Sequence, residues 1–280
     1  MKLEKWSDKV GEFEGKSVIV TGGALGIGGG VSRAFAAAGA NVTVMDIDDE
    51  AGDALIDEIT GADGAAQYVS ADAGTIEGCR ATVDAAIDAY GGIDIVINNV
   101  GIQPPSSYVD AVDLPEESWE RIININLRSR FLMAKYSVPS MRERGGGVII
   151  SVASVQGLLS MPFVSAYAAS KGGDLSLTRQ MSIDFAKDNI RVLSVNPGTI
   201  NTPMVWRALE GTGDDIEQGL IDSAKTHPLG RIGQPADIAN VMLFLASDKA
   251  SFMTGSYVNV DGGMMAVGAW AGTVGAGGSD

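Results

Sequence analysis

Cysteine and histidine are nearly absent from this chain of 280 residues, which contains one of each, Cys79 and His227. A single cysteine excludes an intramolecular disulfide and fits a reducing compartment, so we expect a cytoplasmic protein. Zinc sites of the usual kind need several Cys or His ligands, and we therefore expect no metal site. The two residues lie far apart in the sequence, which argues against a thiol–imidazole catalytic pair and favours structural roles for both.

Positive charge is also scarce, because 20 Lys and Arg residues stand against 35 Asp and Glu residues, for a formal net charge of −15. Nucleic acids and anionic membranes repel such a surface, so we expect neither as a partner. No apolar run approaches the roughly 18 residues of a membrane span. Residues 1–8 mix both charges and lack the apolar region of a signal peptide.

Short β-branched runs alternate with longer segments of helical pattern in this chain. The runs cover residues 17–21, 41–46, 66–70, 93–98, 147–151, 191–195 and 257–260. The helical segments include 27–38, 76–90, 116–144 and 165–187. This alternation predicts an α/β fold: a single-domain, Rossmann-type doubly wound parallel sheet of about seven strands with helices on both faces.

The predicted domain covers residues 16–263, with an N-terminal arm at 1–15 and a Gly/Ala-rich C-terminal tail at 264–280. Residues 199–231 interrupt the alternation, since they are polar, helical in pattern and bounded by prolines. An insertion of this kind is typical of a lid, and we predict that it covers the substrate site.

The first predicted strand ends in the glycine-rich turn Thr21-Gly22-Gly23-Ala24-Leu25-Gly26-Ile27-Gly28. Such a turn lets the backbone approach a pyrophosphate, and the following helix offers free N–H groups and the positive end of its dipole. We therefore predict dinucleotide binding, although the spacing differs from the common G-x-G-x-x-G pattern. Gly29 and Gly30 disfavour a helix, and close helix packing is the simplest reason for them.

Asp46 ends the second predicted strand. An acidic residue at this point accepts hydrogen bonds from the adenosine ribose and repels a 2′-phosphate, so it favours NAD over NADP. The turn contains no Lys or Arg that would offset this preference. The alternative interpretation of Asp46 is a solvated carboxylate, because acidic residues follow at 48–50. Asp72, after the third strand, is a weaker candidate for the adenine end.

Tyr167 and Lys171 lie four residues apart in a helical segment, and Ser154 precedes them after an apolar run. This spacing places both side chains on one helix face. A cation near a phenol favours the phenolate, so we predict that Lys171 lowers the pKa of Tyr167 toward neutral pH. A tyrosine tuned in this way can act as a general acid or base.

Together these motifs resemble the short-chain dehydrogenase/reductase family, in its shorter subclass. The matching segments are the turn at 21–28, Asn98-Asn99-Val100-Gly101, Asn126, Ser154, Tyr167-x-x-x-Lys171, Asn196-Pro197-Gly198, Pro228-Leu229-Gly230-Arg231 and Asp261-Gly262-Gly263. Their order and spacing extend over nearly the full chain. Val100 departs from the family pattern, which has Ala there, and adds bulk near the expected cofactor.

The resemblance implies a role for each matching residue. Tyr167 would be the catalytic acid/base, Ser154 would hold the substrate oxygen, and Lys171 would bind the nicotinamide ribose. Asn126 would hold a water that connects Lys171 to solvent in a proton relay. Asn99 would line the cofactor cleft and stabilise the sheet.

Further contacts follow from the turn, from the strand ends and from the resemblance. The expected cofactor contacts are Gly22, Ala24, Leu25, Gly26, Ile27, Gly28, Asp46, Ile47, Asp72, Ala73, Asn99, Gly101, Tyr167, Lys171, Pro197, Gly198, Ile200 and Thr202. The expected substrate contacts are Ser154, Gln156, Tyr167, Gln103 and Trp206.

We expect an NAD-dependent oxidoreductase that interconverts a secondary alcohol, preferably a polyol, sugar or cyclic alcohol, and its ketone. By resemblance, the helices at 116–142 and 165–187 would pack against a second copy in a homotetramer. One alternative is an NADPH-dependent carbonyl or 3-oxoacyl reductase, against which Asp46 argues. Another is a non-catalytic NAD-binding sensor or scaffold, against which the complete set of four catalytic residues argues.

Overall fold

The computed structural model describes residues 11–212 and 215–267, and within them seven strands form one parallel sheet in the order β3-β2-β1-β4-β5-β6-β7. The strands are β1 (Ser17–Thr21), β2 (Asn41–Asp46), β3 (Ala65–Ser70), β4 (Ile95–Asn98), β5 (Gly147–Val152), β6 (Ile190–Pro197) and β7 (Tyr257–Val260). The predicted Rossmann-type fold is confirmed. The chain order reverses between β1 and β4, the point where sheets of this type bind ligands.

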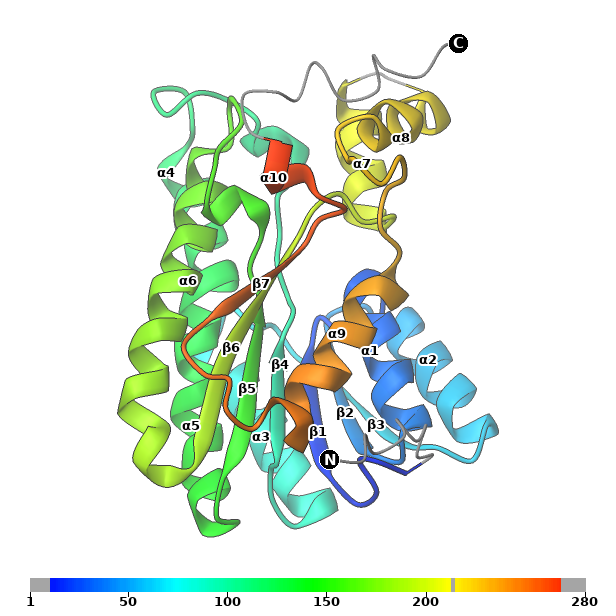
Figure 1. Ribbon diagram of the computed structural model, residues 1–280, viewed down its shortest axis with the longest axis vertical. Coiled ribbons are helices and arrows are strands. Elements are labelled where there is room, and N and C mark those ends of the chain that lie inside the picture. Colours follow the sequence, from blue (N-terminus) through cyan, green and yellow to red (C-terminus); the bar gives the residue numbers. More distant parts are fainter. Residues whose placement is uncertain (1–10, 213–214, 268–280) are drawn as a thin grey trace, which may run out of the picture.

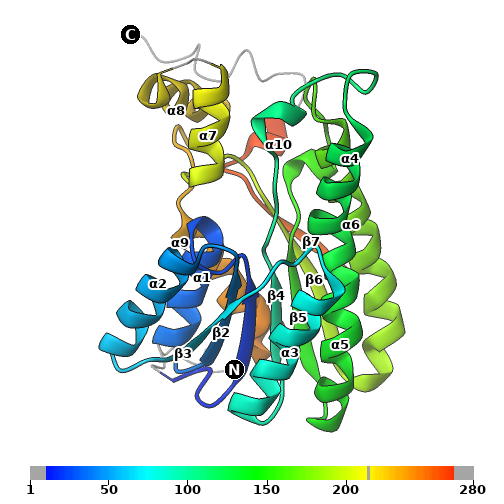
Figure 2. The ribbon, with the colours of Figure 1, turned by 180° about the vertical axis from the view of Figure 1, so that it is seen from behind.

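Helices cover both faces of the sheet (Figures 1 and 2). One layer contains α1 (Gly26–Ala37), α2 (Asp49–Gly61) and α9 (Pro235–Ala246). The other contains α3 (Ile76–Tyr90), α5 (Ser129–Glu143) and α6 (Ser165–Phe185). Successive strand residues serve opposite layers: Val18 and Val20 pack into the first core, and Ile19 packs into the second. This two-sided burial explains why the strands read as unbroken apolar runs.

The helical segment predicted at 116–144 is divided by a π-helical turn. It consists of α4 (Glu116–Ile123), the turn Asn124–Arg128, and α5. In this turn the Ser129 N–H bonds back to the carbonyl of Asn124, five residues earlier. Single π turns of this kind are frequent at functional sites, and Asn126 lies in this one.

The predicted lid forms α7 (Pro203–Thr212) and α8 (Ile216–Ala224), which stand beyond the carboxyl ends of the strands (Figure 1). α7 packs against the short helical turn Pro105–Ser107, since a Cβ added to Gly211 would lie 3.0 Å from the Cβ of Pro105. Residues 213–214 of the predicted lid lie outside the described part of the chain.

The described part of the predicted N-terminal arm belongs to the folded body. Phe13 is buried and contacts Phe35 edge to face, with 5.0 Å between ring centroids. The predicted tail begins with α10 (Met264–Val267). Residues 1–10 and 268–280 lie outside the described residues. No helix in the described ranges is long and apolar enough to span a membrane.

Candidate active site

The predicted site residues gather at the carboxyl edge of the sheet. The glycine turn follows β1, Asp46 ends β2, Asn99 follows β4, and Ser154 follows β5. Because parallel strands end at the same edge, residues far apart in the sequence meet there.

The glycine turn packs too closely for side chains. A Cβ on Gly28 would clash with the backbone carbonyl of Gly22, and a Cβ on Gly30 would lie 2.7 Å from the Cβ of Pro235 on α9. The predicted close packing of Gly30 is thus present. The first turn of α1 has neither a side-chain cap nor an acidic residue. Its N–H groups and dipole therefore suit an anionic group such as a pyrophosphate.

Asp46 holds the glycine turn from the end of β2. One carboxylate oxygen accepts a 3.0 Å hydrogen bond from the Ala24 N–H, and the other accepts one of 2.8 Å from the Ile47 N–H. Asp46 is therefore more than a solvated carboxylate. Its partly buried charge lies where the ribose of a dinucleotide would enter.

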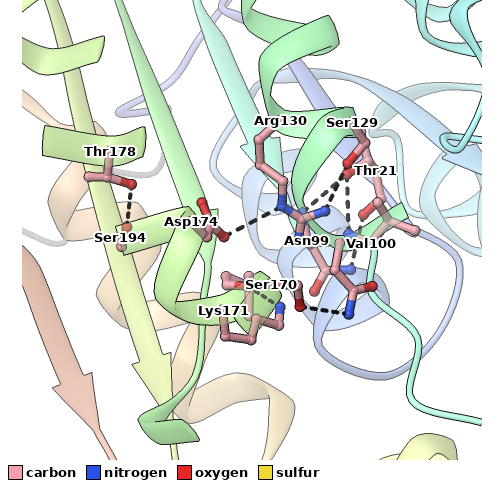
Figure 3. Close-up of polar contacts among 12 residues, drawn as sticks. Thr21, Asn99, Val100, Ser129, Arg130, Ser170, Lys171, Asp174, Thr178 and Ser194 are labelled. Carbon is pink, nitrogen blue, oxygen red and sulfur yellow. Dashed lines mark hydrogen bonds and ion pairs between the residues drawn. The ribbon is translucent and has the colours of Figure 1, made fainter. Parts of the chain in front are cut away.

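Asn99 and Thr21 join the turn to β4 (Figure 3). The Asn99 amide donates to the carbonyls of Thr21 and Gly22, at 3.0 and 2.8 Å. The Thr21 hydroxyl accepts from the N–H groups of Asn99 and Val100, at 3.1 and 3.2 Å. These four bonds fix the two strand ends between which a cofactor cleft would open.

Asp72, a predicted contact for the adenine end of the cofactor, shapes a loop with its neighbours. The Asp72 carboxylate accepts from the Gly74 N–H at 2.8 Å, and Ala73 is buried with its carbonyl 3.3 Å from the Cys79 sulfur. Burial raises the pKa of Cys79 to about 11, which agrees with a structural thiol. Ile47 is mostly exposed and free to cover an adenine ring.

The loop after β6 reaches across to the glycine turn. A Cβ on Gly26 would lie 3.3 Å from the side chain of Thr202, so the turn and this loop are neighbours. His227 supports the loop from the lid side: its Nε2 accepts from the Thr199 N–H at 3.0 Å, and its Nδ1 lies 2.9 Å from the Ser223 carbonyl. Buried and bonded at both nitrogens, His227 has the predicted structural role. Pro197 ends β6, and Gly198 and Ile200 lie in this loop.

Ser154, Tyr167 and Lys171 are brought together by β5 and α6. The nearby Ser154 side chain lowers the pKa of Tyr167, but burial has the larger, opposite effect and raises this pKa to about 12. The Lys171 Nζ lies 5.4 Å from the centroid of the Tyr167 ring and donates a 2.7 Å hydrogen bond to the Val152 carbonyl. Burial, with a smaller contribution from Arg130, lowers the pKa of Lys171 to about 7.

The prediction that the pKa of Tyr167 is lowered toward neutral pH is wrong for the protein without a bound cofactor. Burial of the phenol has the largest effect, and it raises this pKa. Lys171 cannot counter it, since an amine with a pKa of about 7 has lost its charge well before a phenol titrates near 12. At neutral pH Tyr167 is therefore a phenol, a proton donor.

Asn126 occupies the π-helical turn and is fully buried. Its amide oxygen accepts from the Ile102 N–H at 2.8 Å, and its amide nitrogen donates to the Ile102 carbonyl at 2.9 Å and to the Ser170 hydroxyl at 3.3 Å. Asn126 therefore ties the loop after β4 to α6, next to Lys171. Gly101 lies beside both, since a Cβ there would be 3.5 Å from the Lys171 Nζ.

Two glutamines have unpaired polar atoms at this end of the molecule. The Gln103 Nε2 and the Gln156 Oε1 are buried and have no hydrogen-bond partner among the described residues. Gln156 lies two residues after Ser154, and its N–H donates to the Ser154 hydroxyl at 3.1 Å. Trp206 on α7 is partly exposed and donates to the Asn201 side chain at 2.7 Å. Tyr108 contributes to the raised pKa of Tyr167.

Sequence reasoning missed several residues that complete the arrangement. Arg130 and Asp174 form a fully buried ion pair near Lys171. The Val152 carbonyl accepts a hydrogen bond from Lys171, and the Ser170 hydroxyl accepts one from Asn126. Asp174 lies about one helical turn after Lys171, on the face of α6 that packs inward. A charged residue on such a face is the sequence feature that could have indicated a buried ion pair.

Comparisons with known proteins agree with this architecture. Residues 22–265 match the family model described as enoyl-(acyl carrier protein) reductase. The chain is 37% identical to a 2,5-dichloro-2,5-cyclohexadiene-1,4-diol dehydrogenase of Sphingobium indicum, over 91% of this chain and 99% of the relative. It is 36% identical to the 3-oxoacyl-[acyl-carrier-protein] reductase FabG of Thermotoga maritima, over 90% and 99%. The crystal structure of levodione reductase superposes with a TM-score of 0.87 at 30% identity, covering 91% of this chain and 99% of that one. The chain therefore belongs to the short-chain dehydrogenase/reductase family of oxidoreductases, which bind a nicotinamide cofactor.

Proposed function

We propose that this protein is an NAD-dependent oxidoreductase that transfers hydride between a secondary alcohol and NAD, with Tyr167 as the acid/base. The observation that supports it best is the placement of Tyr167 between the Ser154 hydroxyl and the Lys171 side chain, at the sheet edge where the glycine turn lies. Bound NAD would supply the hydride acceptor, or the hydride in the reverse direction.

Side chains of the protein transfer the proton to and from the substrate oxygen. Ser154 holds the substrate oxygen by a hydrogen bond, and Tyr167 donates its proton to that oxygen when a ketone is reduced. Because the pKa of Tyr167 is raised to about 12, the phenol is ready for reduction at neutral pH. Alcohol oxidation needs the phenolate, so its rate should rise with pH. Asn126 holds the Lys171 neighbourhood together, and Lys171 binds the ribose.

Asp46 is the basis for proposing NAD rather than NADP. Its carboxylate is held in place by the Ala24 and Ile47 N–H groups, so it cannot swing away from a 2′-phosphate without losing those bonds. Two like charges about 4 Å apart near a protein surface repel by roughly 4 kcal/mol. Arg33 on α1, a nearby cation, is already paired with Glu58 through two 2.7 Å bonds.

For the substrate we propose a cyclic secondary alcohol with a second oxygen substituent. The unpaired amide donor of Gln103 and the unpaired amide acceptor of Gln156 are costly when buried, and a substrate hydroxyl would satisfy them. A relative at 37% identity is named for a cyclohexadiene-diol, which agrees with this class.

A substrate screen tests the proposal. Cyclic diols, cyclic alcohols without a second oxygen, sugars and linear polyols are supplied with NAD or with NADP, and formation of the reduced cofactor is followed by absorbance. We expect the highest kcat/KM for a cyclic diol with NAD. In the variant Gln156→Leu, the ratio of kcat/KM for the cyclic diol to that for the simple cyclic alcohol should fall by about tenfold, which corresponds to the loss of one hydrogen bond. Equal rates with all classes would contradict the substrate assignment.

A second candidate is an NADPH-dependent 3-oxoacyl reductase, which the description of the matching family model and the FabG relative favour. The same screen, with a 3-oxoacyl thioester and NADPH, separates the two candidates. A scaffold without turnover is the least favoured interpretation, because Asn126, Ser154, Tyr167 and Lys171 are all present and in contact with one another or with shared neighbours.

We also propose a homotetramer in the cytoplasm. α5 and α6 expose large apolar side chains, with Phe131 exposed by 49% and Ile183 by 73%. A second copy packed on these helices would cover them. Analytical ultracentrifugation of the wild type and of Ile183→Lys tests this assembly, and a monomeric wild type would contradict it.

A further inference from the structure

A fully buried ion pair, Arg130 and Asp174, lies near Lys171 (Figure 3). Arg130 on α5 and Asp174 on α6 are both 0% exposed, and the Arg130 Nε lies 3.5 Å from the Asp174 Oδ2. The second nitrogen of the guanidinium, Nη1, donates at 2.9 Å to the Ile125 carbonyl and at 2.9 Å to the Ser129 hydroxyl. Arg130 is the largest fully buried side chain of the described residues.

The pair connects the two elements on which the candidate proton relay is built. Ile125 belongs to the π-helical turn that holds Asn126, and its carbonyl also accepts a 2.6 Å bond from Ser129. Asp174 lies three residues after Lys171 and seven after Tyr167, on the same face of α6. Arg130 thus reaches from the turn of Asn126 to the helix of Tyr167 and Lys171.

Stability alone does not explain this pair. Buried ion pairs are often no more stabilising than apolar residues of the same volume, because removing two charges from water is costly. The hydrogen bonding of this pair is also incomplete, because the Arg130 Nη2 and the Asp174 Oδ1 have no hydrogen-bond partner among the described residues. A pair that is costly and incompletely bonded is better explained by an effect on its neighbours.

We propose that Arg130 and Asp174 are positioning residues that hold the turn of Asn126 against the helix of Tyr167 and Lys171, and that their two opposite charges act on Lys171. This assignment rests on the proposed function for its catalytic meaning, but the electrostatic coupling can be measured without substrate.

The coupling has a defined sign for each partner. The charged groups that act on Lys171 are Arg130 from α5, which lowers its pKa, and Asp174 from its own helix, which raises it. Arg130 is the stronger of the two. Tyr167 also faces Lys171, and its phenol stays neutral throughout the range in which Lys171 titrates. Removing Arg130 should therefore raise the pKa of Lys171, and removing the charge of Asp174 should lower it.

NMR titration of the lysine side chains in the cofactor-free protein tests the proposal, with Lys171→Met to assign the signal. We expect Arg130→Met to move the Lys171 titration to higher pH and Asp174→Asn to move it to lower pH, each by roughly half a pH unit or more. Arg130→Lys, which keeps the charge, should stay closer to the wild type. The double variant Arg130→Met/Asp174→Leu removes both buried charges, keeps an apolar core and should titrate above the wild type.

Thr178→Val is the matched control. It breaks another buried polar contact of α6, the 2.6 Å bond between Thr178 and Ser194, without changing a charge (Figure 3). We expect it to lower the melting temperature and leave the Lys171 titration in place. Shifts of the same sign in both charge variants, or an unmoved titration in the double variant, would overturn the proposal. Coupling without any turnover in the substrate screen would instead contradict the proposed function and leave the positioning role intact.

Discussion

Replacing Lys171 by methionine should stabilise the fold while it removes activity. Lys171 is 2% exposed, and because it is buried, protonation of its side-chain amine costs free energy in the folded protein. A pKa lowered from 10.5 to about 7 corresponds to about 5 kcal/mol at neutral pH, at about 1.4 kcal/mol per tenfold change. Methionine has a similar volume and no charge.

Part of this gain is offset. The Val152 carbonyl loses the 2.7 Å bond from the Lys171 Nζ, and a buried acceptor without a partner costs about 1–3 kcal/mol. The net stabilisation of Lys171→Met should therefore be about 2–4 kcal/mol at pH 7. For a domain of this size that raises the melting temperature by roughly 5–15 °C.

The pH dependence gives the sharper test. The folded-state pKa of Lys171 lies below the unfolded value, so the unfolded chain binds more protons between pH 7 and 10.5 and wild-type stability rises across that window. The advantage of Lys171→Met should be complete below pH 7 and shrink as the pH rises, and above 10.5 the variant should be less stable than the wild type by about 1–3 kcal/mol, the cost of the unpaired Val152 carbonyl. Urea unfolding at several pH values measures it, with the exposed Lys225→Met as control. A variant no more stable than the wild type at pH 6–7 would refute the reasoning.

Three further substitutions test other parts of the site. Gly28→Ala should weaken NAD binding at least tenfold, because its Cβ clashes with the Gly22 carbonyl, whereas Gly61→Ala, where a Cβ meets nothing within 4 Å, should bind normally in the same calorimetric titration. Asp46→Asn should raise the ratio of kcat/KM for NADP to that for NAD by about tenfold or more, since it removes like-charge repulsion; an unchanged ratio would argue against the cofactor assignment. His227→Leu should cost about 1–3 kcal/mol of stability and raise the KM for NAD, because the Thr199 N–H loses its acceptor; an unaltered KM would separate this histidine from the cofactor loop.

The sheet and the placement of the site followed from local signals. Apolar β-branched runs such as 147–151 specify buried parallel strands, and parallel strands bring their carboxyl ends to one edge. The amino-acid sequence alone was therefore enough to place Asp46, Ser154 and the glycine turn together.

The electrostatics of the site could not be predicted in this way. The spacing of Tyr167 and Lys171 suggests mutual stabilisation, but the burial that opposes it comes from the packing of several elements. Arg130 and Asp174 lie 44 residues apart in the sequence, so nothing local pairs them. The π-helical turn also has no clear sequence signal, because its residues continue the pattern of the flanking helices.

The most direct test of the central claim is a paired measurement on Tyr167→Phe: the dissociation constant for NAD, and kcat for the best substrate of the screen as a function of pH. We predict NAD binding within about threefold of the wild type and a kcat lower by several orders of magnitude, because the substrate proton has no acceptor. The kcat of the wild type for alcohol oxidation should rise with pH, and the kcat of the variant should not. A variant that retains wild-type turnover would contradict the account.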